Sequence, residues 1–159
     1  MTDDGLWKRL RVPALVYAAV IFVLCAPVWT SLGERVIGHS RSDVWKHLWG
    51  DHWFRDAFLR ELPVPLYTTQ VGAPDGGVLY NLDPITGMGC WLFGFLPLVP
   101  VHNFMQSLAI VLGALGASVL AERWVQERST AWIAGAVYGF SSHIQAVALS
   151  SGIGETAHI

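Results

Sequence analysis

The sequence predicts an all-α integral membrane protein, a helical bundle of about three transmembrane helices with an extracytoplasmic loop that carries amphipathic interfacial helices. Its 159 residues are 53% hydrophobic and only 14% charged, and the mean hydropathy is +0.43. A soluble domain of this length is normally more polar. The charged residues are also confined to a few segments that separate long apolar runs. Residues 1–159 are therefore interpreted as one membrane module, expected to be the N-terminal part of a longer polytopic protein.

The first predicted transmembrane helix covers residues 12–32. This apolar run has roughly the 20 residues needed to cross a bilayer, and it follows Lys8, Arg9 and Arg11 directly. The positive-inside rule then places the N-terminus in the cytoplasm, and we expect the membrane to be a bacterial inner (plasma) membrane. A cleaved signal peptide is the alternative, but the run is long for one and has no clear Ala-x-Ala site.

Residues 33–102 are predicted to form an extracytoplasmic loop with interfacial helices. Its first part, 33–83, holds seven of the twelve acidic and five of the ten basic residues. A helix capped by Ser42, with Asp43 in its first turn, is predicted to end before Pro63 and to be kinked or divided in two beyond Gly50. Its apolar side is expected to carry Val44, Trp45, Leu48 and Trp49, and its polar side Asp43, Lys46, His47 and Asp51. Tryptophan favours the headgroup zone, so this helix is expected to lie on the membrane surface.

The segment 84–121 contains no charged residue, which leaves its topology ambiguous. It can form two spans, or a re-entrant or juxtamembrane segment at 84–100 followed by one span at 103–121. A single span returns Arg123 and Arg128 to the cytoplasm, as the positive-inside rule prefers. We favour the single span for that reason.

The remaining predicted segments are a cytoplasmic loop at 122–130, a third span at 131–149 and the start of a second extracytoplasmic loop at 150–159. Gly135 and Gly139 form a GxxxG motif in the third span. Gly113 and Ala117 form a similar pair of small residues in the second. Such pairs let transmembrane helices pack backbone to backbone.

Asp43 is the first candidate functional residue, because it stands at the start of a surface helix soon after the first span. A carboxylate there can accept a proton from an attacking group or bind a divalent metal ion. The alternative is a helix-start aspartate that only complements the helix dipole.

Glu155 and His158 are the second candidate, directly after the third predicted span. Glu and His at i and i+3 on a helix can share a metal ion, although known bundle sites use two such pairs. A hydrated interfacial pair is the alternative. The possible metal ligands are therefore Asp43, Glu155 and His158, and the expected ion is Mg²⁺ or Mn²⁺.

Other polar residues give weaker signals. Three histidines and two aspartates crowd the segment 39–56 (His39, His47, His52, Asp51 and Asp56), and His47 and Asp51 are spaced to share a helix face. A metal site is one interpretation of this cluster, and side chains that are simply hydrated are the alternative. The net charge of −2 and the scattered basic residues argue against a nucleic-acid partner. Motifs of soluble nucleotide-dependent and hydrolytic enzymes are absent from the sequence.

The order of the segments resembles the N-terminal module of GT-C-type membrane glycosyltransferases, the superfamily of oligosaccharyltransferase catalytic subunits and protein O-mannosyltransferases. The resemblance rests on an N-terminal span, a long outside loop with an early acidic residue, and two further spans joined by a short charged turn. Residues 112–123 (LGALGASVLAER) and 131–142 (AWIAGAVYGFSS) look like the second and third spans of that superfamily. Glu155-Thr-Ala-His158 departs from the Asp-x-Asp form of some members.

The resemblance implies sugar transfer from a polyprenyl-phosphate donor on the extracytoplasmic side. Asp43 and Glu155 would then be the catalytic carboxylates, and Arg41 or Lys46 would hold the phosphate. His47 is a further candidate for substrate binding. The rival interpretation is a non-enzymatic membrane module, such as part of a transporter or an assembly subunit. The sequence does not indicate the sugar, the acceptor or the oligomeric state.

Overall fold

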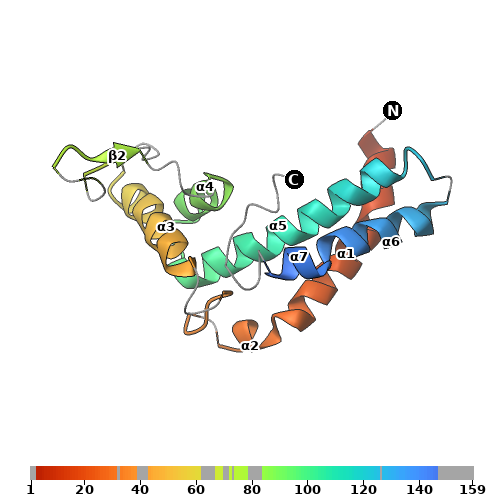
Figure 1. The fold of residues 1–159 in the computed structure, drawn as a ribbon, viewed down its shortest axis with the longest axis horizontal. Helices are drawn as coiled ribbons and strands as arrows, with labels where there is room; N and C mark the ends of the chain where they lie inside the picture. The colour runs from red at the N-terminus through yellow and green to blue at the C-terminus, as the bar shows by residue number, and fades with distance from the viewer. Residues whose placement is uncertain are drawn as a thin grey trace.

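Helix α5 is the longest element, and the other helices pack along it (Figure 1). The computed structural model describes residues 3–31, 33–38, 43–61, 67–69, 72, 74–78, 84–125 and 127–146. The helices are α1 (Asp3–Leu24), α2 (Ala26–Trp29), α3 (Val44–Leu59), α4 (Pro84–Leu92), α5 (Leu98–Ala121), α6 (Arg128–Gly139) and α7 (Ser142–Ile144). A two-stranded antiparallel ribbon, β1 (Tyr67–Thr68) with β2 (Gly77–Val78), lies beyond α3. The predicted all-α class is confirmed.

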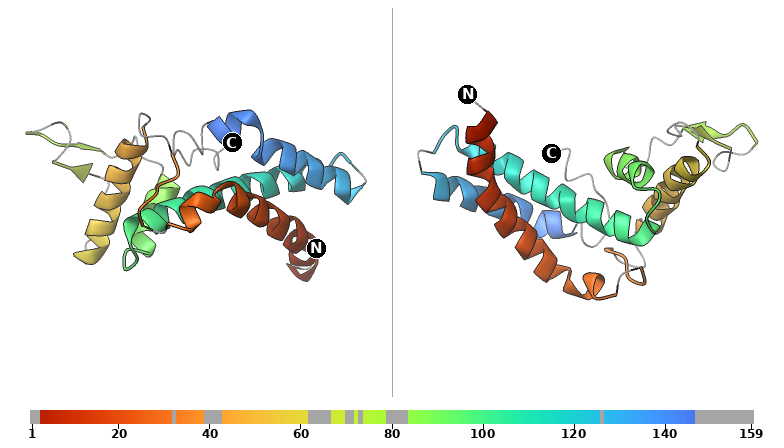
Figure 2. Two further views of the ribbon diagram at one scale, coloured as in Figure 1. Left: turned by 90° about the horizontal axis from the view of Figure 1, so that it is seen from below. Right: turned by 180° about the vertical axis from the view of Figure 1, so that it is seen from behind.

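Helix α5 has 24 residues, none of them charged, and is about 36 Å long. Among the described residues it is the one helix long and apolar enough to cross a membrane. Helices α3 and α4 pack on its N-terminal part, whereas α1 and α6 pack nearer its C-terminal end (Figures 1 and 2). The two ends of α5 therefore meet different parts of the chain.

The expected bundle of three transmembrane helices is not confirmed. The first predicted span, 12–32, is interrupted, because α1 ends at Leu24 and α2 starts at Ala26. Pro27 lies in the first turn of α2, and proline has no N–H with which to continue the helix. Helix α1 also begins at Asp3, so its first half contains the basic residues that were expected to precede the span.

The third predicted span, 131–149, is interrupted too. Helix α6 has only 12 residues, fewer than a crossing requires. The Ser141 hydroxyl accepts a hydrogen bond from the Ile144 N–H at 3.3 Å and so caps the separate helix α7. The second predicted span, 103–121, lies within α5, which begins earlier, at Leu98.

The ambiguity over residues 84–121 is reduced by α4. This helix has nine residues, too few to cross a bilayer. It is followed by a turn at 93–96 and by Pro97, after which α5 begins. The chain therefore forms one helix of crossing length in this segment rather than two, and the single crossing stays a prediction.

Small residues set the close packing of α6 on α5. A Cβ atom on Gly139 would approach the Ala114 Cβ to 2.6 Å, and one on Gly135 would approach the Ala114 carbonyl oxygen to 2.5 Å. The GxxxG prediction is thus confirmed for Gly135 and Gly139. The α5 residues that face them are Ala114 and Ser118, one position along from the expected Gly113 and Ala117.

The glycines of α4 have a similar role. Gly87 lies against the Phe54 ring, and Gly89 lies against the Met105 side chain of α5. Phe54 and Met105 belong to one buried cluster with Cys90 and Val101. Helix α3 is continuous through Gly50, so the two-part form of this helix is not observed. Gly50 is buried against its neighbours instead of marking a break.

Arg9 and Glu122 join the start of α1 to the end of α5. Arg9 Nη2 is 2.8 Å from Glu122 Oε2, and both side chains are partly buried. Further along, the Tyr17 hydroxyl lies 2.7 Å from Ser118 Oγ and donates a hydrogen bond to the Trp132 carbonyl at 2.6 Å. Helix α1 therefore runs opposite to α5, with the N-terminal basic segment beside the turn that follows α5.

We predict that Gly135→Ala lowers the thermal stability of the protein, whereas Gly116→Ala does not. The new methyl group at 135 would collide with Ala114, Ser118 and Tyr17, and overpacking of this kind costs about 1–3 kcal/mol. Gly116 lies in α5 with open space around it, where alanine is the better helix former. Thermal unfolding in detergent measures both, and an unchanged midpoint for Gly135→Ala would contradict the observed packing.

Candidate functional site

Asp43 is the N-terminal cap residue of α3, but its side chain does not cap the helix. The Asp43 carbonyl accepts the first hydrogen bonds of α3, from the amides of Lys46 at 2.9 Å and His47 at 3.2 Å. The carboxylate makes no capping bond, is 65% exposed and lies 3.7 Å from the Lys46 ammonium. An aspartate at this position usually accepts an amide hydrogen bond. The Asp43 carboxylate is thus left available to solvent or to a ligand.

The segment before α3 is held to α5 by Asn103. The Asn103 Oδ1 atom accepts a 2.8 Å hydrogen bond from the Ile37 amide, and its Nδ2 donates a 2.8 Å bond to the Arg35 carbonyl. Asn103 itself is fully buried. Gly38 follows with φ of 141°, and a Cβ there would meet the Val44 side chain at 2.7 Å. Glycine is therefore required at 38 both by its backbone conformation and by the close approach of α3.

A buried carboxylate–imidazole pair then joins α3 to α5. His102 Nδ1 lies 2.6 Å from Asp51 Oδ2, and the two side chains are 0% and 4% exposed. His47 lies one turn before Asp51 on the same face of α3, and Gln106 lies one turn after His102 on the same face of α5. All four side chains are buried, and we call His47, Asp51, His102 and Gln106 the polar junction.

The polar junction corrects the predicted faces of α3. His47 and Asp51 were expected on the polar, water-facing side, but they lie on the buried side with Val44 and Leu48. Trp45, expected on the apolar side, is 58% exposed. The spacing of His47 and Asp51 on one face was correctly predicted. That this face points inward was not predicted, because a buried carboxylate is stable only with a partner such as His102.

The predicted site residues are only partly within the described structure. Asp43 and Lys46 lie together at the start of α3 and are exposed, whereas His47, four residues along, is buried in the polar junction. Arg41, Glu155 and His158 lie outside the described residues, so whether they approach Asp43 stays a prediction. Among the residues that are described, no group of three metal-ligating side chains occurs.

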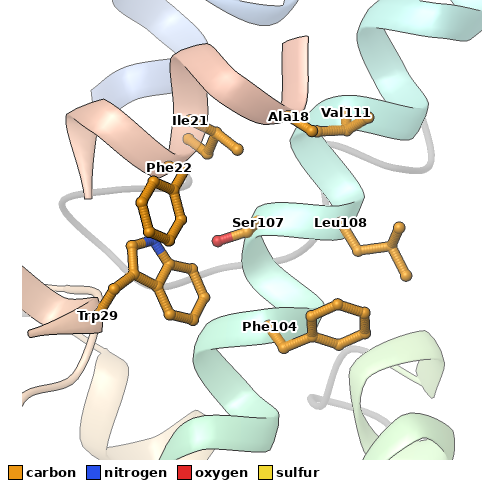
Figure 3. A pocket seen from close by; sticks show the side chains of 8 residues that line it. All are labelled: Ala18, Ile21, Phe22, Trp29, Phe104, Ser107, Leu108 and Val111. Atoms are coloured by element: carbon orange, nitrogen blue, oxygen red, sulfur yellow. The ribbon is translucent and has the colours of Figure 1, made fainter. Parts of the chain in front are cut away.

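An apolar groove lies between α1 and α5, on the same half of α5 as the polar junction. Its volume is about 310 Å³. Figure 3 shows its lining: Ala18, Ile21, Phe22, Trp29, Phe104, Ser107, Leu108 and Val111. The Phe22 and Trp29 rings are stacked at one wall, with centroids 6.0 Å apart. The Ser107 hydroxyl donates a 2.9 Å hydrogen bond to the Asn103 carbonyl. The Trp29 indole N–H is a buried donor without a partner in this lining, and the other lining side chains are apolar, so the groove is suited to a mostly apolar occupant.

Phe104 also lines a second apolar groove, of about 370 Å³, with Phe93, Leu96, Pro100 and Val101. The Phe104 side chain is half-exposed. The two grooves therefore form a mostly apolar surface on the N-terminal half of α5.

Comparison with protein-family models, with curated proteins and with solved structures finds no match to this chain. The resemblance to GT-C-type glycosyltransferases accordingly stays a prediction. Sequence reasoning also missed His102, which it placed at the end of the extracytoplasmic loop, and Asn103, which it placed at the start of the second span. One signal could have found them. Two pairs of polar residues, one helical turn apart, interrupt a mostly apolar run: His102 with Asn103, and Gln106 with Ser107. Polar residues within such a helix need buried partners.

We predict that Asp51→Asn or His102→Ala destabilises the fold by about 3 kcal/mol, because each leaves a buried polar partner unsatisfied. Asp56→Asn is the matched control. Asp56 pairs with Arg60 at 2.9 Å on the outer part of α3, where the Arg60 side chain is 69% exposed, and such pairs contribute less than about 1 kcal/mol. Thermal or denaturant unfolding in detergent compares them. Equal losses in all three variants would show that the Asp51–His102 pair does not hold α3 in place.

Proposed function

We propose that this chain is the N-terminal module of a membrane glycosyltransferase of the GT-C type. It would transfer a sugar from a polyprenyl-phosphate donor at the extracytoplasmic surface of a bacterial inner membrane. Asp43 is proposed as the catalytic carboxylate.

The observation that carries this proposal is the separation of charges by α5. The basic residues Arg9 and Arg123 lie at the C-terminal end of this uncharged helix, as the Arg9–Glu122 ion pair requires. The Asp51–His102 pair joins α3, and with it Asp43, to the second turn of the same helix. If α5 crosses the bilayer, the positive-inside rule puts its basic end in the cytoplasm. Asp43 then stands on the opposite surface, where lipid-linked donors would be used.

The exposed carboxylate of Asp43 supports the role of general base. In the proposed reaction the acceptor oxygen forms a bond to the anomeric carbon of the sugar, and Asp43 takes the proton from that oxygen. The bond between the anomeric carbon and the phosphate oxygen breaks, and polyprenyl phosphate leaves with the bonding electrons. The reaction therefore needs no oxidant or reductant.

Lys46 supports the second half of the step. Its ammonium is half-exposed and lies 3.7 Å from the Asp43 carboxylate, so it can interact with the phosphate leaving group beside the base. Arg41 is proposed to assist it. Binding of Mg²⁺ or Mn²⁺ by Asp43 with Glu155 and His158, and a catalytic role for Glu155, are further proposals that rest on the resemblance.

The apolar grooves on α5 support a lipid-linked donor. A polyprenyl chain needs an apolar surface that ends near water, and the grooves lie on the half of α5 to which α3 and the 33–38 segment are attached. A soluble sugar nucleotide would have no use for such a surface.

We expect Asp43→Asn to reduce sugar transfer by the full-length protein about a hundredfold or more, because general-base catalysis contributes at least that factor. Asp56→Asn, on the same helix, should leave transfer unchanged. The assay measures transfer from a radiolabelled polyprenyl-phosphate sugar at matched protein levels. Full activity of Asp43→Asn would remove the catalytic role of Asp43, and no transfer by the unmodified protein would favour a non-enzymatic module.

We also expect Thr69 and Ser129 to lie on opposite sides of the membrane. Both residues are exposed. In a background with Cys25 and Cys90 replaced by alanine, Thr69→Cys should react with an impermeant maleimide in intact spheroplasts. Ser129→Cys should react only after the membrane is permeabilised. Labelling of both from the same side would contradict the proposed crossing by α5.

A further inference from the structure

Four exposed basic residues gather at the C-terminal end of α5. Lys8 and Arg11 come from α1, and Arg123 and Arg128 come from the turn after α5 and the start of α6. The Arg9–Glu122 ion pair brings these two parts of the chain together, and the start of α1, the end of α5 and the start of α6 meet at one end of the molecule in Figures 1 and 2. We call Lys8, Arg11, Arg123 and Arg128 the basic end.

Two tryptophans accompany the basic end. Trp7 is 71% exposed and Trp124 is 75% exposed, although tryptophan is usually well buried in proteins. Trp7 directly precedes Lys8, and Trp124 directly follows Arg123. Exposed tryptophan beside lysine and arginine is typical of a surface that meets lipid headgroups.

The acidic residues near the basic end offset part of its charge, but not all of it. Glu122 is paired with Arg9 at 2.8 Å, so these two charges offset each other, and Glu127 sets one negative charge against the four positive charges of the basic end. Asp3 and Asp4 precede Lys8 in the sequence and add two further negative charges. The described residues between 33 and 78 have the opposite balance, with six acidic and four basic residues.

We propose that the basic end is a binding surface for anionic phospholipid headgroups. Lysine and arginine form charge-assisted hydrogen bonds with phosphate oxygens, and each basic residue near an anionic leaflet contributes about a fivefold gain in affinity. The two indoles pack at the headgroup level beside them. The inference rests on the proposed membrane location of the chain, but not on glycosyl transfer.

The test compares two double variants that each remove two exposed arginines. Arg11→Gln/Arg123→Gln alters the basic end, and Arg35→Gln/Arg60→Gln alters the other end of the molecule. Full-length protein in detergent is titrated with dioleoyl-phosphatidylglycerol or with dioleoyl-phosphatidylcholine, and bound lipid is counted by native mass spectrometry. A third variant, Arg11→Lys/Arg123→Lys, retains the charges.

The unmodified protein should prefer phosphatidylglycerol, and Arg11→Gln/Arg123→Gln should weaken that binding at least about tenfold. The Arg35→Gln/Arg60→Gln and lysine variants should keep the preference, and binding of phosphatidylcholine should not change. Equal binding of the two lipids by the unmodified protein would overturn the inference. An equal loss in the two double glutamine variants would also overturn it, because general charge and not the basic end would then be responsible. The result does not depend on enzymatic activity, so it is separable from failure of the proposed function.

Discussion

The hydrogen bond between Asp51 and His102 is the contact on which the arrangement of the candidate site depends. It joins a short amphipathic helix to the second turn of a long apolar one, and both partners are buried. A carboxylate in such a place is stable only while its partner is present. The pair thereby sets both the position of α3 along α5 and the side of α3 that faces inward. Asp43 and Lys46 are exposed at the N-terminal start of the same helix, where Asp43 is the cap residue.

Helix α5 combines two kinds of surface along its length. Near its start, His102, Asn103 and Gln106 are buried and hold the segments that lead to the candidate site. Near its end, Ala114 and Ser118 allow α6 to approach closely and Tyr17 to reach both helices. Polar contacts therefore hold the neighbouring segments at the start of α5, and small residues allow close helix packing toward its end. The same helix separates the basic end from Asp43.

The grooves beside Phe104 fit this division. They are lined almost entirely by apolar side chains, and they lie along the N-terminal half of α5. An apolar chain placed there would have its polar head near the segments that Asn103 and Asp51 hold to α5. A site of this kind depends on loops anchored to a helix rather than on a closed cavity.

The sequence by itself determined the helical class, the apolar character of α5, the GxxxG contact and the exposed aspartate at the start of α3. These follow from composition, local spacing and helix-start preferences, which involve residues close together in the chain. It did not show that the runs 12–32 and 131–149 are interrupted, because apolar composition continues past Leu24 and Gly139, where α1 and α6 end. Only the tertiary structure decided that His47 and Asp51 face inward. That outcome depends on His102, about fifty residues later, and the amphipathic pattern of α3 contains no information about a partner on another helix.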